Sequence, residues 1–311
     1  MRKLFGRELF GRQLFRRKLL SLGLLSLLLV MLWAVIQPQR DQLATATSSS
    51  QPDDSQQMMH AHLGDRPIAS GAIALAPAVP VTAEPVTYAT VDGKPITGYL
   101  ARPANSTAPL PGIIVIHEWW GLNENIQQMT ERLAGEGYTA LAVDLYAGSV
   151  AQTPEQARAL TQAAAQTPQL LEDNLKQAYQ YLETEQNSPK IASLGWCFGG
   201  SWSLNTALLF PTELDAAVIY YGSQLVTERD RLTPLQMPIL GIFGALDENP
   251  SVETVRSFEA ALNELGKSAE IYVYDGANHA FANPSGTRYN AQAAEDAWGK
   301  TTAFLSQHLN D

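Results

Sequence analysis

Cysteine is nearly absent from this chain, whose 311 residues include one, Cys197. A single cysteine excludes an internal disulfide, and it excludes the paired thiols of a dithiol redox protein and the thiolate clusters that hold structural zinc. Histidine is also scarce, with five residues. We therefore expect no cofactor and no bound metal. Cys197 is left with two possible roles, as a buried packing residue or as a lone nucleophile.

Basic residues are scarce beyond the N-terminus. Residues 1–40 carry eight Lys or Arg and one acidic residue, whereas the rest of the chain carries 13 basic and 30 acidic residues. Proteins that bind phosphate backbones need clustered Lys and Arg. The acidic body of the chain therefore predicts no nucleic-acid partner, while its 45% apolar content is enough for a large core.

The one long hydrophobic run lies near the N-terminus. Residues 19–36 are apolar and uncharged, and as a helix they would be about 27 Å long, close to the thickness of a bilayer core. The basic residues Arg16, Arg17 and Lys18 precede the run, so the positive-inside rule places the rest of the chain outside the cytoplasm. The run is either an uncleaved signal anchor or a signal peptide, and the distance to Ala44-Thr45-Ala46 slightly favours the anchor.

The regions around this run are simple in composition. Residues 1–18 form a basic extension, and residues 37–84 are rich in Gln, Ala, Ser, Thr and Pro without sustained periodicity. We interpret 37–84 as a disordered linker and 85–311 as one catalytic domain. The predicted protein is extracytoplasmic and anchored to the membrane through residues 19–36, and its oligomeric state is left open.

From residue 85 onward, apolar strands alternate with helical stretches. This alternation predicts a mostly parallel sheet covered by helices on both faces. The expected strands are 86–91, 96–102, 112–117, 138–145, 190–194, 215–221, 238–243 and 271–274, and the expected helices are 125–135, 154–166, 168–185, 201–209, 251–265 and 289–309.

A strand, the motif Gly195-Trp196-Cys197-Phe198-Gly199 and a helix follow one another in the layout of a nucleophile elbow. In that fold an acid and then a histidine follow the nucleophile, each after a later strand. Asp247 follows the strand 238–243, and His279 follows the strand 271–274. A turn aspartate and a loop histidine are the simpler interpretations of these two residues. Their order and context instead favour a triad.

These pieces resemble the dienelactone hydrolase family of α/β-hydrolases. The resemblance covers residues 85–310 and rests on segments that lie at predicted strand ends, namely 117–123, 144–146, 195–200, 220–222, 244–247 and 279–281. It implies an α/β-hydrolase fold. It also implies hydrolysis of a small-molecule ester or lactone through a Cys-Asp-His triad with an acyl-thioester intermediate.

The resemblance assigns roles to individual residues. Cys197 would be the nucleophile, His279 its base, and Asp247 the group that orients the imidazole. The oxyanion would be held by the backbone N–H groups of Phe198 and Trp119. In the family, a glutamate at the position of Glu118 interacts with the thiol and influences its ionisation; the simpler interpretation of Glu118 is a loop carboxylate. His117 is expected to be a hydrogen-bonded histidine at a strand end.

Four aromatic residues near the predicted site are candidates for substrate binding, with core packing as the alternative: Trp120, Tyr146, Trp196 and Phe281. One residue departs from the family pattern. Dienelactone-cleaving members carry a substrate-binding arginine shortly after the catalytic histidine, and this chain has Asn283 there. The register of Arg158, which could match another family arginine, is left open, and so is the chlorinated-catechol substrate of the namesake enzyme. A catalytically inactive extracytoplasmic binding or scaffold protein on the same fold is the alternative function.

Overall fold

The computed structural model describes His62, Gly64, Asp65 and residues 76–310. In this part of the chain, eight strands form one sheet in the order β1-β2-β4-β3-β5-β6-β7-β8. The first two neighbouring pairs, β1 with β2 and β2 with β4, are antiparallel, and all later pairs are parallel. The strands are β1 (Val81–Val91), β2 (Lys94–Pro103), β3 (Gly112–Ile116), β4 (Thr139–Val143), β5 (Ile191–Trp196), β6 (Ala216–Tyr220), β7 (Ile239–Gly244) and β8 (Ala269–Tyr274).

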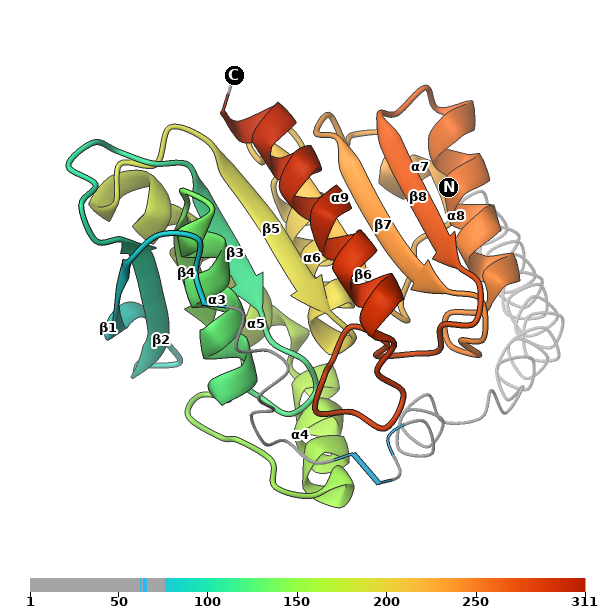
Figure 1. Ribbon diagram of the computed structural model, residues 1–311, viewed down its shortest axis with the longest axis horizontal. Helices are drawn as coiled ribbons and strands as arrows, with labels where there is room; N and C mark the ends of the chain where they lie inside the picture. The colour runs from blue at the N-terminus through green and yellow to red at the C-terminus, as the bar shows by residue number, and fades with distance from the viewer. Residues whose placement is uncertain (1–61, 63, 66–75, 311) are drawn as a thin grey trace, which may run out of the picture. The chain divides into compact units, whose positions relative to one another are not determined.

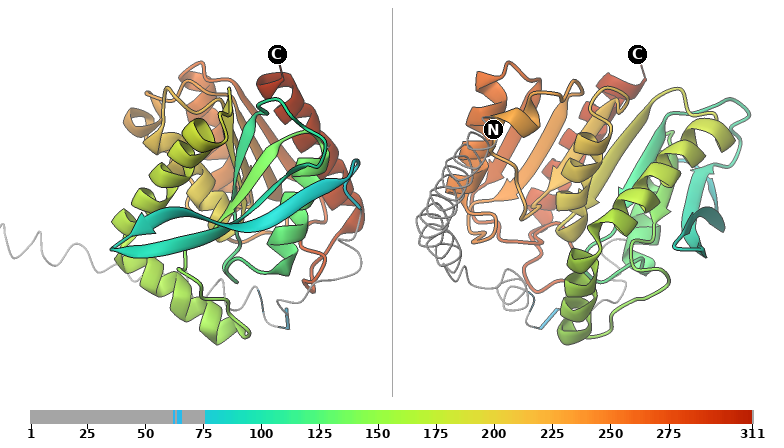
Figure 2. Two further views of the ribbon diagram at one scale, coloured as in Figure 1. Left: turned by 90° about the vertical axis from the view of Figure 1, so that its left-hand side faces the viewer. Right: turned by 180° about the vertical axis from the view of Figure 1, so that it is seen from behind.

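Helices cover both faces of the sheet. Helices α3 and α9 lie in front of the sheet in Figure 1, and α5 and α6 lie on the opposite face, which Figure 2 shows from behind. The helices are α3 (Glu124–Gly135), α4 (Pro154–Gln166), α5 (Pro168–Gln180), the π-helix η1 (Tyr181–Glu185), α6 (Phe198–Leu209), α7 (Arg229–Leu232), α8 (Val252–Glu264) and α9 (Ala291–Leu309).

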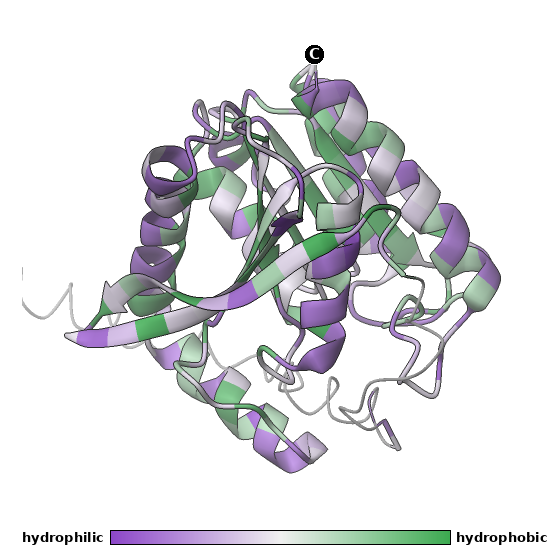
Figure 3. Cartoon of the chain, turned by 60° about the vertical axis from the view of Figure 1, so that its left-hand side comes forward, coloured by the Kyte–Doolittle hydropathy of each residue, from purple (hydrophilic) through white to green (hydrophobic). Residues whose placement is uncertain are grey.

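The central strands explain this layering. Every residue of β3, β4, β5, β6 and β7 is buried, as expected for strands that are covered on both faces. Figure 3 shows the complementary pattern on the helices, whose outward sides are hydrophilic. The mostly parallel sheet covered on both faces, predicted from the alternation of elements, is therefore confirmed, and so is the α/β-hydrolase fold that the resemblance implied.

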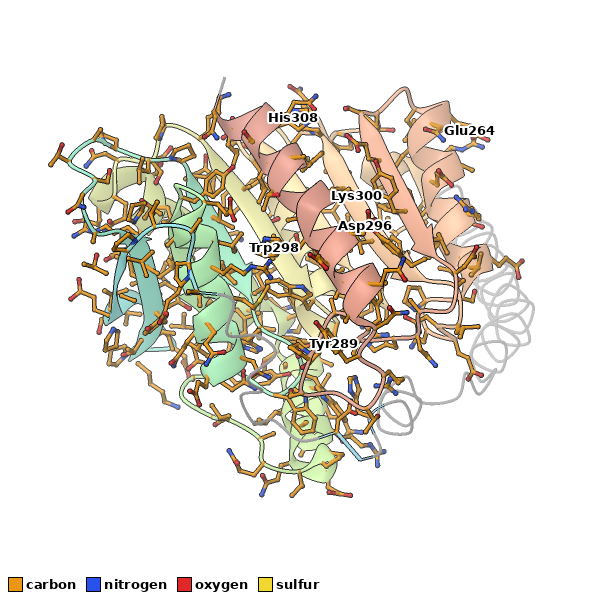
Figure 4. All side chains as sticks on the ribbon, in the orientation of Figure 1. Glu264, Tyr289, Asp296, Trp298, Lys300 and His308 are labelled. Carbon is orange, nitrogen blue, oxygen red and sulfur yellow. The ribbon has the colours of Figure 1, made fainter. Side chains whose placement is uncertain are left out.

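Helix α9 contacts both helix α3, on the same face of the sheet, and strand β6. Its Trp298 receives the guanidinium of Arg132 from α3, 3.9 Å from the ring centroid, and Figure 4 shows Trp298 on the side of α9 that faces α3. The hydroxyl of Tyr220, at the end of β6, donates to the carbonyl of Ala297 over 3.1 Å. The hydrogen bond holds the end of β6 against α9. Directly after β6 the chain enters the site described below.

The element boundaries differ from the sequence prediction in three places. Strand β1 begins at Val81, within the segment 37–84 that was predicted to be linker. The predicted helix 168–185 is α-helical to Gln180 and then becomes π-helical. The four-residue helix α7 was not predicted, because four residues are too few to show a helical period.

The predicted N-terminal extension 1–18 and hydrophobic run 19–36 lie outside the described residues, so the membrane anchor stays a prediction. Within His62, Gly64, Asp65 and 76–310, none of the helices has both the length and the apolar character needed to traverse a bilayer.

Candidate active site

Cys197 stands at the sharp turn between β5 and α6. Its backbone has φ 56° and ψ −116°, a strained conformation for a residue with a side chain. The turn leaves no room for a Cβ atom at Gly195 or at Gly199, two residues before and two residues after Cys197. A Cβ on Gly195 would meet the carbonyl oxygen of Gly199 at 2.2 Å, and a Cβ on Gly199 would meet that of Ile116 at 2.2 Å. Glycine at both positions is thus a steric requirement of the elbow, which fixes the thiol at the start of α6.

Asp247 and His279 meet because β7 and β8 are adjacent parallel strands. Asp247 follows β7 and His279 follows β8, so both lie at the same end of the sheet. The Nδ1 atom of His279 donates to Oδ2 of Asp247 over 2.8 Å, and the other carboxylate oxygen accepts from the backbone N–H of Asn249. The imidazole therefore carries a proton on Nδ1. Its Nε2 lies within 4.8 Å of the Cys197 sulfur and is buried without a hydrogen-bond partner among the described residues.

Electrostatics favour an ion pair between the thiol and the imidazole. Burial, the largest single influence, raises the pKa of Cys197, but the charge of and hydrogen bonding to His279, together with those of His62, lower the pKa to about 6. Burial lowers the pKa of His279, but the negative charges of Asp247 and Cys197 raise it to about 10. These two shifts express the same interaction between two buried groups. At neutral pH the favoured state is a thiolate beside an imidazolium.

Glu118 lies immediately after β3 and is buried. One of its carboxylate oxygens accepts a hydrogen bond from the side-chain amide of Asn283, and the other has no partner among the described residues. Burial, and next the negative charge of Cys197, raise the pKa of Glu118 to about 8. Asn283, which stands where the resemblance places an arginine, thus contacts Glu118. At neutral pH the carboxyl group of Glu118 favours its protonated form.

The two predicted oxyanion residues lie at the same end of the sheet. Trp119 comes after β3, Phe198 comes after β5, and β3 and β5 are parallel neighbours. Phe198 is the first residue of α6, where a helix has backbone N–H groups without intrahelical acceptors. His117 has both ring nitrogens in hydrogen bonds: Nδ1 donates to the carbonyl of Glu118, and Nε2 accepts from the N–H of Leu145. It is therefore a structural histidine, as expected.

The four predicted substrate-binding aromatics separate into different environments. Trp196 lines a small pocket, with an enclosed volume of about 20 Å³, together with Glu118 and Asn283. Trp120 packs edge-on against Trp119, and Phe281 packs between Tyr221 and Tyr274. Tyr146 packs at a tilt against Phe198 and lines a second hollow, of about 210 Å³, between the β1–β2 turn and helices α4 and α5. Among the four, Trp196 is the one that lines the pocket beside Glu118.

Tyr221 is a site residue that sequence reasoning did not single out. It follows β6, has φ 36°, and packs its ring 5.3 Å from that of His279. Its hydroxyl is buried without a hydrogen-bond partner among the described residues, and Tyr221 lines the small pocket beside Glu118. Burial, followed by the negative charge of Glu118, raises its pKa well above the ordinary value. The available signal was its place in the Tyr220-Tyr221-Gly222 segment at a strand end.

His62 and Asp65 are two further residues that the sequence did not reveal. Both are buried, and His62 places Nε2 3.9 Å from the Cys197 sulfur and its ring 4.6 Å from that of Trp119. Asp65 accepts hydrogen bonds from His62 Nδ1 and from Thr287. Both residues come from the segment 37–84, whose composition gives no signal of a site. Of these two residues, His62 lies directly against the candidate nucleophile.

Known proteins resemble this chain in sequence and in fold. The family model described as the dienelactone hydrolase family matches residues 96–309, which is more than half of the chain. The chain belongs to the dienelactone hydrolase family. This membership makes it a carboxylic ester hydrolase of the dienelactone hydrolase type.

Individual relatives agree with this membership. A protein of Saccharolobus solfataricus named "Putative carboxymethylenebutenolidase" is 33% identical over 253 residues, covering 69% of this chain and 95% of the relative. "Protein usf" of Aquifex pyrophilus is 33% identical over 225 residues, covering 70% and 96%. A solved structure titled as a "Putative Dienelactone Hydrolase" from Klebsiella pneumoniae is 29% identical, with a TM-score of 0.66 and coverage of 73% and 99%.

Proposed function

We propose that this dienelactone hydrolase family member cleaves small esters or lactones with Cys197, His279 and Asp247 as a catalytic triad. The hydrogen bond from His279 Nδ1 to Asp247 is the observation that carries the proposal, because it leaves Nε2 directed at the thiol of the elbow. The alternative of an inactive binding protein is not favoured, since such a protein has no need to keep a buried, charged pair at this position.

The first half of the reaction forms a thioester. The Cys197 thiolate attacks the ester carbonyl carbon, and the backbone N–H groups of Trp119 and Phe198 stabilise the oxyanion. When the intermediate collapses, the C–O bond to the alkoxide breaks and His279 Nε2 gives its proton to the leaving oxygen. In a lactone, the leaving hydroxyl stays attached to the acyl group.

The second half of the reaction releases the acid. His279 Nε2, now neutral, removes a proton from water, and the resulting hydroxide attacks the thioester carbon. Collapse breaks the C–S bond and returns Cys197 as thiolate and His279 as imidazolium. Asp247 stabilises the cation in both halves without itself accepting a proton.

The pocket beside Glu118 indicates the kind of substrate. Its enclosed space of about 20 Å³ is lined by Trp196 and apolar residues of α3. The polar groups in its lining are Glu118, Asn125, Tyr221 and Asn283, and no cationic residue lines it. A substrate carboxylate would find no positive partner there. We therefore propose uncharged esters and lactones with a small acyl group as the substrate class.

This function is tested by hydrolysis assays on the full chain. We expect turnover of p-nitrophenyl acetate and of an uncharged aromatic lactone, and a lower kcat/KM for a lactone that carries a free carboxylate. Absence of turnover across this panel, in a preparation with native circular dichroism, would contradict the enzyme assignment and favour the inactive binding protein.

The ionisation of Cys197 predicts the pH dependence of its alkylation. Iodoacetamide reacts with thiolate, and the pKa of about 6 lies below the ordinary value of 9.0. The alkylation rate of the folded chain should therefore rise with pH to half its maximum near pH 6 and then stay level. Stopped samples analysed by mass spectrometry measure this rate. A midpoint near pH 9, as for the unfolded chain, would rule out the ion pair.

Glu118 should impose an inflection on the pH–rate profile of ester hydrolysis. Its pKa of about 8 means that it becomes ionised above pH 8, beside the position where the oxyanion develops. We expect wild-type kcat/KM to fall above pH 8, and Glu118→Gln to hold its plateau toward pH 10 because it cannot acquire that charge.

The matched control for this prediction is Glu124→Gln, which removes an exposed carboxylate in the first turn of α3. Glu124→Gln should keep the wild-type inflection. If Glu118→Gln kept it too, Glu118 would be reduced to a structural carboxylate.

We also propose that the N-terminal run 19–36 exports the enzyme and anchors it outside the cytoplasm. The run itself and the basic residues before it support this location. The full chain should fractionate with membranes, and a chain without residues 1–40 should not. Recovery of the full chain in the soluble cytoplasmic fraction would overturn the proposal.

A further inference from the structure

The active site contains a second histidine aimed at the nucleophile. His62 Nε2 lies 3.9 Å from the Cys197 sulfur, and these two atoms and His279 Nε2 all lie within 4.8 Å of one another. The two imidazole rings are nearly perpendicular, at 88°, with centroids 5.4 Å apart. His62 precedes residues 96–309, which the family model matches.

Each histidine is held by a carboxylate on its other nitrogen. His62 Nδ1 donates to Oδ2 of Asp65 over 2.7 Å, and His279 Nδ1 donates to Oδ2 of Asp247 over 2.8 Å. Asp65 is fixed in turn by the backbone N–H and the hydroxyl of Thr287, each at 2.7 Å. A carboxylate on the second nitrogen is the arrangement that orients histidines as metal ligands, because it leaves the Nε2 lone pair pointing into the site.

We propose that His62, Cys197 and His279 form a zinc-binding site that holds the enzyme in an inactive state. One thiolate and two imidazoles are a donor set that zinc prefers. Zinc bonds of about 2.3 Å to sulfur and about 2.1 Å to nitrogen place tetrahedral ligand atoms roughly 3.5 Å apart. The observed separations are 3.9 Å between His62 Nε2 and the sulfur and at most 4.8 Å among the three ligand atoms, so side-chain movements of about 1 Å would complete the site.

Burial supports a ligand at this position. All three residues are buried, and His279 Nε2 has no hydrogen-bond partner among the described residues. A buried ring nitrogen without a partner is unfavourable, and zinc would satisfy it by displacing the proton that Nε2 carries in the imidazolium. Three protein ligands leave a fourth position for water.

Zinc bound here would block the proposed reaction directly. It would occupy the sulfur that attacks the ester and the nitrogen that transfers the proton, so hydrolysis would require release of the metal. The site also depends on His62 and Asp65 keeping their places against the domain. Zinc would therefore hold His62 beside the nucleophile.

The test measures metal binding by the full chain independently of ester hydrolysis. Chain freed of metal with a chelator is titrated with Co²⁺, which substitutes for zinc. We expect a thiolate-to-cobalt charge-transfer band in the near ultraviolet and tetrahedral visible bands that saturate at one equivalent. Zinc affinity is then measured by competition with a chromophoric chelator, and inhibition by zinc is measured relative to each variant's own metal-free rate.

Three variants separate this site from adventitious binding. Asp65→Asn should weaken zinc affinity by about 10–100-fold, since it removes the carboxylate that orients a ligand. His62→Ala should weaken it further, because it removes the ligand itself. His308→Ala is the control: this histidine packs on Phe304 of α9, and Figure 4 places it at the C-terminal end of that helix. It should bind zinc as the wild type does.

The results of these experiments test the zinc site separately from the proposed ester hydrolysis. Absence of the charge-transfer band, or unchanged zinc affinity in a folded His62→Ala chain, would overturn the zinc site. A cobalt band that His62→Ala loses, in a chain that hydrolyses no ester, would support the zinc site while refuting the proposed hydrolysis.

Discussion

Cys197→Ala should lower kcat/KM for p-nitrophenyl acetate by about 10⁴-fold, because members of a triad act as a unit and loss of the nucleophile removes the covalent route. The thiol is small and buried, so the exchange should leave the circular dichroism spectrum unchanged and the thermal midpoint within a few degrees of wild type. Steady-state kinetics on the purified full chain measure the effect. The remaining rate would reflect substrate binding and the oxyanion donors alone.

The single cysteine supplies the control for this experiment. Iodoacetamide should add one equivalent to the wild-type chain and none to Cys197→Ala, and the loss of wild-type activity should follow the degree of labelling. Activity that survives complete labelling, or an alanine variant that hydrolyses the ester at the wild-type rate, would show that another group attacks the carbonyl.

Asp247→Asn should lower kcat/KM by on the order of 10⁴-fold and also change the ionisation of its neighbours. Asp247 is the largest of the influences that raise the pKa of His279 to about 10. Without that negative charge the imidazole favours its neutral form, and Cys197 loses the positive charge that stabilises its thiolate. The alkylation midpoint should therefore move from about pH 6 toward the ordinary thiol value of 9.0.

Asp275→Asn is the matched control for this second prediction. Asp275 lies in the turn directly after β8, exposed to solvent and four residues before His279. Asp275→Asn removes one negative charge near the same loop, as Asp247→Asn does, but without a contact to the imidazole of His279. Both its activity and its alkylation midpoint should stay at the wild-type values. An equal loss of activity in both variants would mean that the loop, and not the hydrogen bond of Asp247, is responsible.

The fold was predictable because its signals are local. Continuous apolar stretches such as 112–116 and 239–244 form strands buried on both faces, and helical stretches that begin with proline or a capping residue alternate with them. Parallel strands joined through helices place their carboxyl ends at one edge of the sheet. The order of Cys197, Asp247 and His279 along the chain therefore carried information about their proximity in space.

The roles of the aromatic residues could not be predicted from the sequence in the same way. Trp120, Tyr146, Trp196 and Phe281 all follow or end strands near the elbow, yet one lines the pocket at Glu118 and the others pack elsewhere. A side chain at a strand end can turn toward the core, the pocket or a neighbouring loop. Which of these it does depends on the packing of all its neighbours, which sequence spacing does not encode.

The sequence by itself determined the family, the hydrolase fold and the elements that carry the proposed triad, because a strand, a glycine-bounded turn and a helix are local patterns. The tertiary structure alone decided what lies over the nucleophile. His62 and Cys197 are 135 residues apart in the chain, and Asp65 and Thr287 are 222 apart. Such contacts form when a polar segment finds matching hydrogen-bond partners on a finished surface, and no periodicity in the segment reports them.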